Sequence, residues 1–392
     1  MIVLDLARSL IGVVGMAASK IPPLDERFGL TQRISGPWPE GPFLWFHGAS
    51  LGECRMLLNV AKSIQEDIKD CPRILITTQK VDVLEFLEQS GENISCCIAP
   101  ADTPYTMVRF IKKTRPIGLV LAENELWPGY LSSMRKITIK PSVAIVSGRY
   151  QMAVSKSDFA AIGFASMQSG ADSSRLAAEC PPETASKIQI GGDWKLLPWV
   201  RSNKEIEAPK DPIVDTTFLS MHFSEWNSLL RMVLSSVKRQ ESVVVIPRRL
   251  EEVDSFREEL RDQELLVVEW PLVQKGAVSL VSKYGQTREV LEKSKTAIVG
   301  GSFSRTLGVH DFWEPLQLGV STCIGPYSHG QKATVEALVR EGVLSQLHST
   351  ADYAKRDLPD IRLVKTFLAH ERSKVSDSYK QFVIYLENLI QS

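Results

Sequence analysis

Short apolar runs that alternate with helix-like stretches constrain the fold of this chain more than any other feature. In the first half, the expected strands are Phe43 to Phe46, Ile74 to Thr77, Ile117 to Leu121 and Ser142 to Val146, and the expected helices are Glu53 to Asp67, Val81 to Gln89 and Thr103 to Lys113. Such an alternation predicts a parallel sheet with helices on both faces.

A second series of the same kind begins after Pro212. Its expected strands are Phe218 to Ser220, Val243 to Ile246, Leu265 to Val268, Val278 to Leu280, Ala297 to Val299 and Thr322 to Ile324, with helices at Ser224 to Gln240 and Leu250 to Gln263. Residues 201–212, between the two series, are polar and contain proline, which is typical of an interdomain linker. Because 392 residues exceed what one hydrophobic core usually serves, we expect two Rossmann-like, doubly wound α/β domains facing a cleft.

The expected boundaries follow from these patterns. They are an N-terminal helix at 1–20, an N-terminal domain at 21–201, a linker at 202–212, a C-terminal domain at 213–375 and a C-terminal helix at 376–392. Charge is balanced, with Lys+Arg 46 against Asp+Glu 46, so the basic excess typical of nucleic-acid binding is missing. The six cysteines include no C-x-x-C pair, which argues against a disulfide framework or a structural zinc site and fits a reducing cytoplasm.

The first nineteen residues are mostly apolar but carry Asp5 and Arg8. Their longest uncharged run, Ser9 to Ser19, is too short to span a bilayer. A signal peptide would place a basic region before the apolar stretch, whereas the first charge here is acidic. We expect an interfacial helix that lies on a membrane, with Lys20 at the headgroup level; a helix docked on its own domain is the alternative.

Two acidic residues stand directly after the expected strand Ile117 to Leu121. They are Glu123 and Glu125, followed by Trp127-Pro128. Ligands bind at the C-terminal edge of an open α/β sheet, and carboxylates are costly to bury unless they are paired or used. The pattern therefore favours a site, although solvated acids at a capped strand end would give the same sequence.

A second candidate is the turn after the strand that ends at Phe46. The segment His47-Gly48-Ala49-Ser50-Leu51-Gly52-Glu53 places Glu53 at the opening of a helix, where we expect it to point into the cleft. The field of a helix N-terminus favours an ionised carboxylate, so Glu53 could accept a proton. The alternative is an ordinary acid in a first helical turn.

In the second half, glycines follow the strand Ala297 to Val299. Gly300-Gly301-Ser302 would let backbone N–H groups approach a phosphate, and His310 and Glu314 follow after a short loop. Arg248 and Arg249, just past another strand, are fork donors suited to a phosphate, or else a surface basic patch. Together these residues are typical of the nucleotide side of a glycosyltransferase.

These motifs, taken in order, resemble the Kdo transferases, the bacterial 3-deoxy-D-manno-octulosonic acid transferases of lipopolysaccharide synthesis. The matching segments are Glu26-Arg27-Phe28-Gly29, Ser50-Leu51-Gly52-Glu53, Glu123 to Pro128, Gly192-Asp193-Trp194-Lys195, Ser220 to Glu225, Pro247-Arg248-Arg249, Gly300-Gly301-Ser302, Gly308 to Pro315 and Gly325-Pro326. Several positions depart from the family pattern. They are Ser147-Gly148-Arg149 for Asn-Ala-Arg, Asp193 for Asn, Arg249 for His, Asp311 for Asn, and the surroundings of Gly330-Gln331.

The resemblance implies a GT-B architecture and inverting transfer of Kdo from CMP-Kdo to a hydroxyl of a lipid A precursor, without a metal or cofactor. It implies that Glu53 is the catalytic base. The implied acceptor-binding residues are His47, Ser50, Glu123, Glu125, Arg149 and Lys195, and the implied donor-binding residues are Arg248, Arg249, Gly285, Gly301, Ser302, His310 and Glu314.

The expected location is the cytoplasmic face of the bacterial inner membrane, peripheral or monotopic, with the membrane contacted through the helix at 1–20. Two other functions fit the same residues. One is an enzyme of the same fold that uses another sugar nucleotide, and the other is a degenerate member that binds nucleotide or lipid A precursor without turnover.

Overall fold

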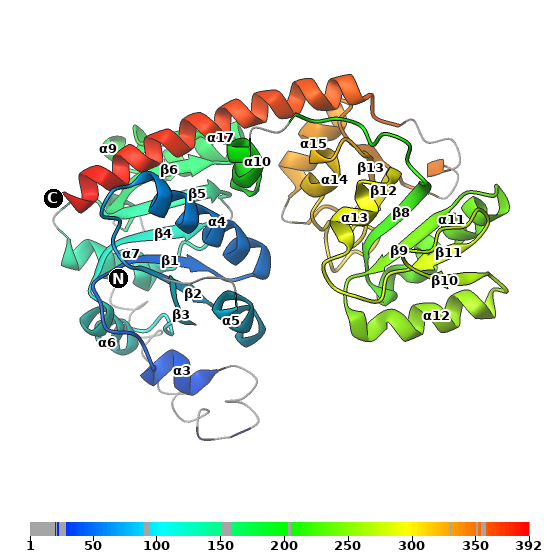
Figure 1. Ribbon diagram of the computed structural model, residues 1–392. Coiled ribbons are helices and arrows are strands. Elements are labelled where there is room, and N and C mark those ends of the chain that lie inside the picture. The colour runs from blue at the N-terminus through cyan, green and yellow to red at the C-terminus, as the bar shows by residue number, and fades with distance from the viewer. Residues whose placement is uncertain are drawn as a thin grey trace. The chain divides into compact units, whose positions relative to one another are not determined.

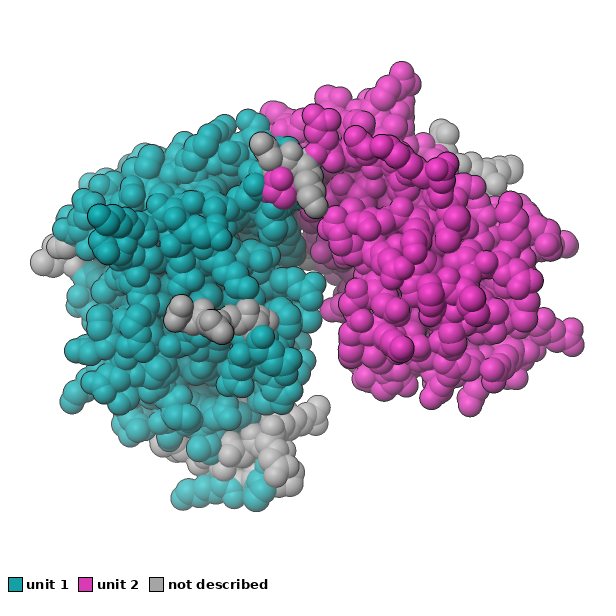
Figure 2. Space-filling model, viewed as in Figure 1, with its two compact units in different colours: residues 1–201, 372–392 teal, residues 202–371 magenta. Residues whose placement is uncertain are grey.

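The computed structural model describes residues 20, 22, 29–89, 94–138, 140–150, 158–202, 205–329, 331–349, 352–353 and 358–391. The chain divides into two compact units (Figures 1 and 2). Unit 1 comprises Met1–Arg201 and Arg372–Ser392, and unit 2 comprises Ser202–Glu371. The helix expected at 1–20 lies outside the described residues, apart from Lys20.

Unit 1 is built on a seven-stranded sheet in the order β3-β2-β1-β4-β5-β6-β7, in which every pair of neighbours is parallel. The strands are β1 (Phe43–Gly48), β2 (Ile74–Thr78), β3 (Ile94–Ile98), β4 (Pro116–Ala122), β5 (Val143–Gly148), β6 (Ile162–Met167) and β7 (Ile188–Ile190). All six residues of β1 are buried, as expected for a central strand covered on both faces. The strand order reverses between β1 and β4, which is therefore the topological switch point of this sheet.

Helices connect these strands and lie on both sides of the sheet (Figure 1). They are α3 (Leu30–Ser35), α4 (Leu51–Asp67), α5 (Val81–Glu88), α6 (Pro104–Thr114), α7 (Pro128–Ile137), η1 (Phe159–Ala161), α8 (Gly170–Glu179), α9 (Pro182–Ala185), η2 (Trp194–Leu196) and α10 (Leu197–Ser202). Proline is the first residue of both α6 and α7, where its missing N–H is not needed.

Unit 2 repeats this architecture with a second seven-stranded parallel sheet in the order β10-β11-β9-β8-β12-β13-β14. Its strands are β8 (Val214–Met221), β9 (Val243–Pro247), β10 (Val267–Glu269), β11 (Val278–Leu280), β12 (Ser294–Val299), β13 (Ser321–Ile324) and β14 (Ser345–Gln346). Its helices are η3 (Phe223–Glu225), α11 (Trp226–Lys238), η4 (Leu250–Glu252), α12 (Val253–Asp262), α13 (Thr287–Leu291), α14 (Trp313–Gln317) and α15 (Lys332–Arg340). The switch point of this sheet lies between β8 and β12. Two doubly wound α/β domains are thus confirmed.

The last helix, α17 (Ile361–Ile390), is longer than the helix expected at 376–392. The boundary between the units falls inside it, between residues 371 and 372. Its second half belongs to unit 1, where the ring of Phe382 lies 5.3 Å from that of Trp194 and 5.4 Å from that of Phe164. Ser378 Oγ also donates to Ser166 Oγ over 2.7 Å. The C-terminal segment is therefore part of the unit 1 core.

The segment expected to be a linker contains a buried apolar residue. Its described part, from residue 205, belongs to unit 2, and Ile206 is only 5 % exposed. One apolar residue of this stretch therefore packs against the rest of the protein. Among the described residues, no helix is both long and apolar enough to cross a membrane.

Candidate functional site

The predicted acidic residues meet at the switch point of unit 1. β1 and β4 are neighbours in the sheet, with His47 paired to Leu121 in register. His47 is near the end of β1, and α4 begins three residues after that strand ends. Glu123 and Glu125 follow directly after β4. Two chain segments far apart in the sequence thus bring their polar side chains to the same edge of the sheet.

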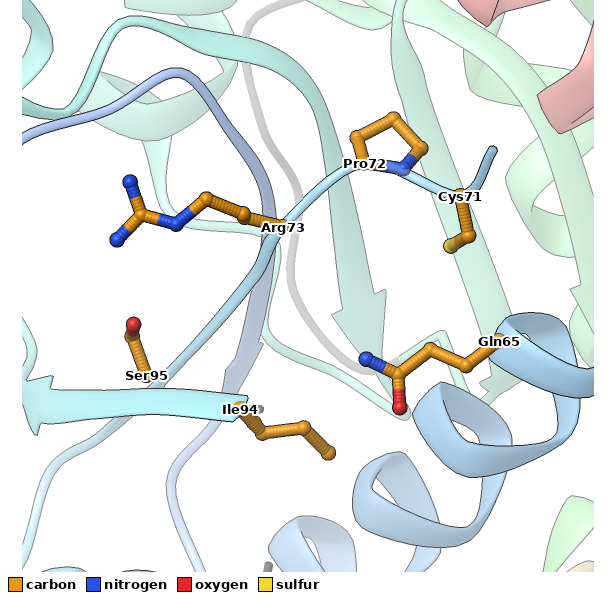
Figure 3. Close-up of a pocket in the computed structure, with 6 residues that line it drawn as sticks. All are labelled: Gln65, Cys71, Pro72, Arg73, Ile94 and Ser95. Atoms are coloured by element: carbon orange, nitrogen blue, oxygen red, sulfur yellow. The ribbon is translucent and has the colours of Figure 1, made fainter. Parts of the chain in front are cut away.

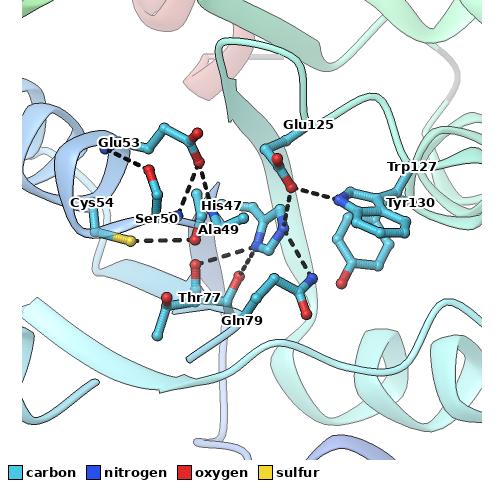
Figure 4. A network of polar contacts seen from close by, with 12 residues as sticks. His47, Ala49, Ser50, Glu53, Cys54, Thr77, Gln79, Glu125, Trp127 and Tyr130 are labelled. Carbon is cyan, nitrogen blue, oxygen red and sulfur yellow. Dashed lines mark hydrogen bonds and ion pairs between the residues drawn. The ribbon is translucent and has the colours of Figure 1, made fainter. Parts of the chain in front are cut away.

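Glu53 closes a capping box at the start of α4 (Figure 4). The Ser50 hydroxyl accepts the Glu53 N–H over 3.3 Å, and Glu53 Oε2 accepts the N–H groups of Ala49 at 2.6 Å and Ser50 at 3.1 Å. These bonds satisfy two backbone N–H groups just before α4 that have no partner within the helix. Because Oε2 takes both amides, Oε1 lies outside the capping box. Glu53 therefore has a structural role and retains a second oxygen for chemistry.

Glu123 is a buried carboxylate with two cationic partners. Its side chain is 2 % exposed, and its backbone has a left-handed φ of 47°. Lys195 Nζ lies 2.8 Å from Glu123 Oε1, and the Arg149 guanidinium pairs with Oε2. The Arg149 N–H also donates to the Glu123 carbonyl over 3.1 Å. Pairing on both oxygens explains how the fold holds this charge away from water.

The same two cations extend this cluster toward Glu53. A side-chain carbon built on Gly52 would lie 3.9 Å from Lys195 Cε, which places the lysine against the first turn of α4. Burial lowers the pKa of Arg149, while the charges of Asp193 and Glu53 act in the opposite direction. Glu53 and Arg149 are therefore close enough to interact electrostatically. We call Glu53, Glu123, Arg149 and Lys195 the acid–base cluster.

Two of the departures from the family pattern touch each other beside this cluster. Ser147 Oγ donates to Asp193 Oδ1 over 3.1 Å, and the Lys195 N–H donates to the same oxygen over 3.0 Å. Asp193 is 3 % exposed, and Ser147 has a left-handed φ of 54°. Asp193 therefore fixes the backbone that carries Lys195, which makes it a positioning residue that the predicted site set omitted.

His47 and Glu125 form a separate pair (Figure 4). His47 Nε2 lies 3.2 Å from Glu125 Oε2, and His47 Nδ1 lies 2.9 Å from Thr77 Oγ1. Trp127 Nε1 donates to Glu125 Oε2 over 2.6 Å. Burial raises the pKa of Glu125, but the hydrogen bond and charge of His47 and the Trp127 bond outweigh it, so the pKa is lowered overall. Glu123 and Glu125 thus serve different partners, although only one residue separates them.

The second group of residues gathers at the switch point of unit 2. The Arg248 N–H donates to the Met221 carbonyl over 2.7 Å, and the Gly300 N–H donates to the Leu219 carbonyl over 2.8 Å. These bonds join the ends of β9, β8 and β12, which are adjacent in the sheet. Arg248 and Arg249 are both exposed there, so their guanidinium groups can reach a ligand.

Glu225 holds the glycine-containing loop of unit 2. This carboxylate is 2 % exposed and accepts the N–H groups of Gly301 at 2.7 Å and Phe303 at 3.3 Å. It also accepts the His222 N–H over 3.0 Å. Burial raises the pKa of Glu225, and the three amide bonds oppose that rise. In this arrangement the amides of Gly301 and Phe303 are engaged with Glu225 and cannot also bind a phosphate.

Ser302 and Gly301 have structural roles in the same loop. Ser302 is fully buried; its hydroxyl donates to the Val299 carbonyl and accepts the Gly325 N–H over 2.8 Å, which ties the ends of β12 and β13 together. A side-chain carbon on Gly301 would meet the Gly308 carbonyl at 2.1 Å, and φ there is 74°. Only glycine fits at Gly301.

His222 and His310 form a hydrogen-bonded pair, with 2.8 Å between their Nε2 atoms. Burial is the main cause that lowers the pKa of His310, to about 3, and the charge of Arg248 adds to it. Burial also lowers the pKa of His222; Glu252 opposes this, and Arg249 and Arg248 reinforce it. The pair is therefore neutral at physiological pH beside two arginines, which suits an anionic ligand.

The remaining predicted donor residues are Glu314 and Gly285, both in unit 2. Glu314 is partly buried in the short helix α14, just after Asp311, whose side chain accepts the Trp313 N–H over 2.9 Å. Gly285 has φ 81°, and a side-chain carbon there would meet nothing within 4 Å. Glycine at this position is explained by its backbone conformation and not by close packing.

Sequence reasoning left out several residues that the structure places in these groups. They are Thr77, Gln79, Ser147, Asp193, His222 and Glu225. The last three lie inside segments that resemble the family, so the motif itself was the available signal. Among the described residues, no group of three or more His, Cys, Asp or Glu side chains could hold a metal ion.

The cavity drawn in Figure 3 lies away from these residues. It measures about 550 Å³ and is lined by Gln65, Cys71, Pro72, Arg73, Ile94 and Ser95. Gln65 lies near the end of α4, and the other lining residues stand just before or at the start of β2 and β3, the N-terminal ends of these strands. Since ligands of parallel sheets bind at the opposite edge, its volume does not make it the functional site.

Comparison with solved structures supports the architecture. A glycosyltransferase from Rickettsia africae aligns with a TM-score of 0.52 at 12 % identity and covers 89 % of this chain and 97 % of its own. A UDP-GlcNAc 2-epimerase from Neisseria meningitidis, bound to UDP-GlcNAc, aligns with a TM-score of 0.54 at 11 % identity and covers 89 % of this chain and 100 % of its own. The fold is that of the GT-B glycosyltransferases and epimerases.

Comparison of sequences relates the chain to one group of transferases. The 3-deoxy-D-manno-octulosonic-acid transferase (kdotransferase) family model matches residues 23–196. The 3-deoxy-D-manno-octulosonic acid transferase of Chlamydia pneumoniae is 27 % identical over 346 residues, which is 81 % of this chain and 77 % of that protein. The transferase of the same name from Aquifex aeolicus is 24 % identical over 334 residues, with 84 % and 89 % covered. With its motifs in the same order, this chain is similar to the 3-deoxy-D-manno-octulosonic acid (Kdo) transferases over more than 80 % of its length.

Proposed function

We propose that this protein is an inverting glycosyltransferase that moves Kdo from CMP-Kdo to a hydroxyl of a lipid A precursor. The observation that carries the proposal is the acid–base cluster. Two backbone amides hold the Glu53 carboxylate at the start of α4, and this carboxylate lies within electrostatic reach of Arg149. Arg149 and Lys195 both pair with Glu123. The similarity to Kdo transferases indicates the sugar, and the cluster contains a base with cations beside it.

In this mechanism, unit 1 binds the acceptor and Glu53 removes the proton from its hydroxyl. Oε1 is the oxygen that accepts this proton, since Oε2 is bound by the capping amides. The acceptor oxygen then attacks the anomeric carbon of Kdo as the bond to CMP breaks, which inverts that carbon. Lys195 and Arg149 bind the polar groups of the acceptor, while Glu123 fixes both cations in place.

Unit 2 binds the donor. Negative charge that develops on the departing CMP phosphate is balanced by Arg248 and Arg249, beside the neutral His222–His310 pair. Because Glu225 occupies the amides of Gly301 and Phe303, the arginine side chains carry more of this task than the loop backbone. Glu314 holds the ribose of the nucleotide, and Ser302 and Gly285 shape the loops around it.

An enzyme that uses another sugar nucleotide is the main competing function. Arg249 stands where the family has histidine and Asp311 where it has asparagine, and both lie on the donor side. Calorimetric titration of CMP-Kdo, CMP and UDP-GlcNAc into the full chain tests the donor. We expect CMP and CMP-Kdo to bind and UDP-GlcNAc not to compete. Preferential binding of UDP-GlcNAc would reject CMP-Kdo as the donor.

Single-turnover assays test the other alternative, a protein that binds its ligands without reacting. A binder without activity would retain CMP affinity but form no product with enzyme in excess of donor. We also propose that the enzyme works at the cytoplasmic face of the bacterial inner membrane, held there by residues 1–20. The sequence of that segment supports this location, because its apolar run is too short to span a bilayer and long enough to lie in its interface.

A further inference from the structure

Two adjacent helices of unit 1, α6 and α7, carry positive charge and no carboxylate. Arg109, Lys112 and Lys113 lie on α6, and Arg135 and Lys136 lie on α7. The whole chain has equal numbers of basic and acidic residues, so this is a local excess. Lys113 Nζ lies 3.5 Å from the carboxylate of Glu40, which precedes β1. The two helices thus form a cationic face on a protein of zero net charge.

An apolar groove runs between the same helices. It measures about 270 Å³ and is lined by Pro104, Met107, Val108, Ile111, Lys112, Ser132, Ser133, Lys136 and Ile137. Val108 is 69 % exposed and Ile137 is 44 % exposed. Both lysines of the lining are also exposed. An apolar floor with ammonium groups beside it matches one chemistry, an acyl chain joined to an anionic headgroup.

The groove is connected to the acceptor side of the site through α7. Trp127 precedes that helix and donates to Glu125, and the ring of Tyr130, in its first turn, lies 5.1 Å from the ring of His47. Helix α3 lies next to α6, because Arg109 of α6 donates to the Ile34 carbonyl of α3 over 3.4 Å (Figure 1). The apolar segment at 1–19 precedes α3 in the sequence.

We propose that α6 and α7 dock on an anionic lipid surface, with an acyl chain in the groove and Lys112 and Lys136 against the headgroups. This docking face is distinct from residues 1–20 and would act in addition to them. It rests on the proposed function only in expecting a lipid acceptor; binding to vesicles is measured without any turnover.

Flotation with lipid vesicles tests the proposal on the full chain. Vesicles of mixed phosphatidylglycerol and phosphatidylcholine are compared with vesicles of phosphatidylcholine alone. Each lysine near an anionic surface contributes about 1 kcal/mol, so Lys112→Gln with Lys136→Gln should weaken partitioning into the anionic vesicles about thirtyfold. Val108→Asn should weaken binding to both kinds of vesicle, because it removes exposed apolar surface from the groove.

Lys62→Gln with Lys69→Gln is the matched control, since these two exposed lysines lie elsewhere on unit 1. It should lower partitioning much less than the α6–α7 pair. Wild-type binding by the Lys112/Lys136 variant would overturn the proposal, and so would an equal loss in the control. If residues 1–19 filled the groove themselves, both groove variants would bind like wild type, which again overturns it. Absence of Kdo transfer by wild-type protein that binds these vesicles would instead count against the proposed function.

Discussion

Replacing Glu53 by glutamine should separate its chemical role from its structural role. The amide oxygen of glutamine can still accept the N–H groups of Ala49 and Ser50, which Oε2 accepts at 2.6 and 3.1 Å. What is lost is the negative charge at the start of α4, which stabilises a helix by about 0.3–1 kcal/mol. The free energy of unfolding should fall by no more than that amount.

The effect on turnover should be much larger. General-base catalysis contributes at least about a hundredfold, which corresponds to about 2.7 kcal/mol in the activation barrier. Glu53→Ala also removes the side-chain oxygen that accepts the two backbone N–H groups. It should cost about 2 kcal/mol of stability, about 1 kcal/mol for each hydrogen bond lost. Stability and turnover should therefore change in different proportions in the two variants.

The assay combines urea unfolding, calorimetric CMP binding and the rate of CMP release with donor and acceptor present. Glu66→Gln, the same change farther along α4 at a side chain that is 68 % exposed, is the control and should keep wild-type turnover. Near-wild-type turnover in Glu53→Gln would refute the assignment of the base. A loss of CMP binding equal to the loss of turnover would mean that Glu53 acts through folding alone.

Other perturbations have equally definite outcomes. Arg248→Ala with Arg249→Ala should weaken CMP affinity by about 1.5–3 kcal/mol, the range for charged hydrogen bonds; unchanged calorimetric affinity would remove these residues from the donor site. Deleting residues 1–19 should release the protein from membranes and raise the apparent KM for membrane-embedded acceptor, with little change for detergent-dispersed acceptor; a truncated chain that melts far below full length would contradict the anchor. The pKa of Glu125 is lower in the folded state than in the unfolded chain. The ionised Glu125 side chain therefore stabilises the fold fully above its unfolded pKa of about 4.3, and this stabilisation is lost as the pH falls through the folded-state pKa. Glu125→Gln should thus flatten the acid limb of a plot of unfolding free energy against pH. An acid limb identical to wild type would show that the His47 pairing is not linked to folding.

The sequence was sufficient to predict the fold class because hydrophobic periodicity and strand–helix alternation are local. Strands such as β1 and β4 were expected nearly where they occur, since they are continuous apolar runs. β3 (Ile94–Ile98, ISCCI) was not expected, although it is as long as β2 and its run is apolar. The start of α17 at Ile361 was also missed, since a helix that belongs to two units carries no single apolar stripe.

The motifs predicted the site residues, but they could not predict which side chains pair with each other. Glu123 and Glu125 look equivalent in the sequence, yet a left-handed φ at Glu123 sends them to different partners. Gly301 was expected to offer its amide to a phosphate, and Glu225, far away in the sequence, accepts that amide instead. Such contacts depend on which strands are neighbours in the sheet, and local sequence patterns do not contain that information.

The most direct test of the whole account is the mass of the product that the wild-type protein forms. Purified full-length protein is mixed with CMP-Kdo and a lipid A precursor, and the lipid is analysed by mass spectrometry. We expect the precursor to gain the mass of Kdo while an equal amount of CMP is released. An unchanged precursor, from protein that is folded and binds CMP, would contradict the proposal that this chain is a Kdo transferase.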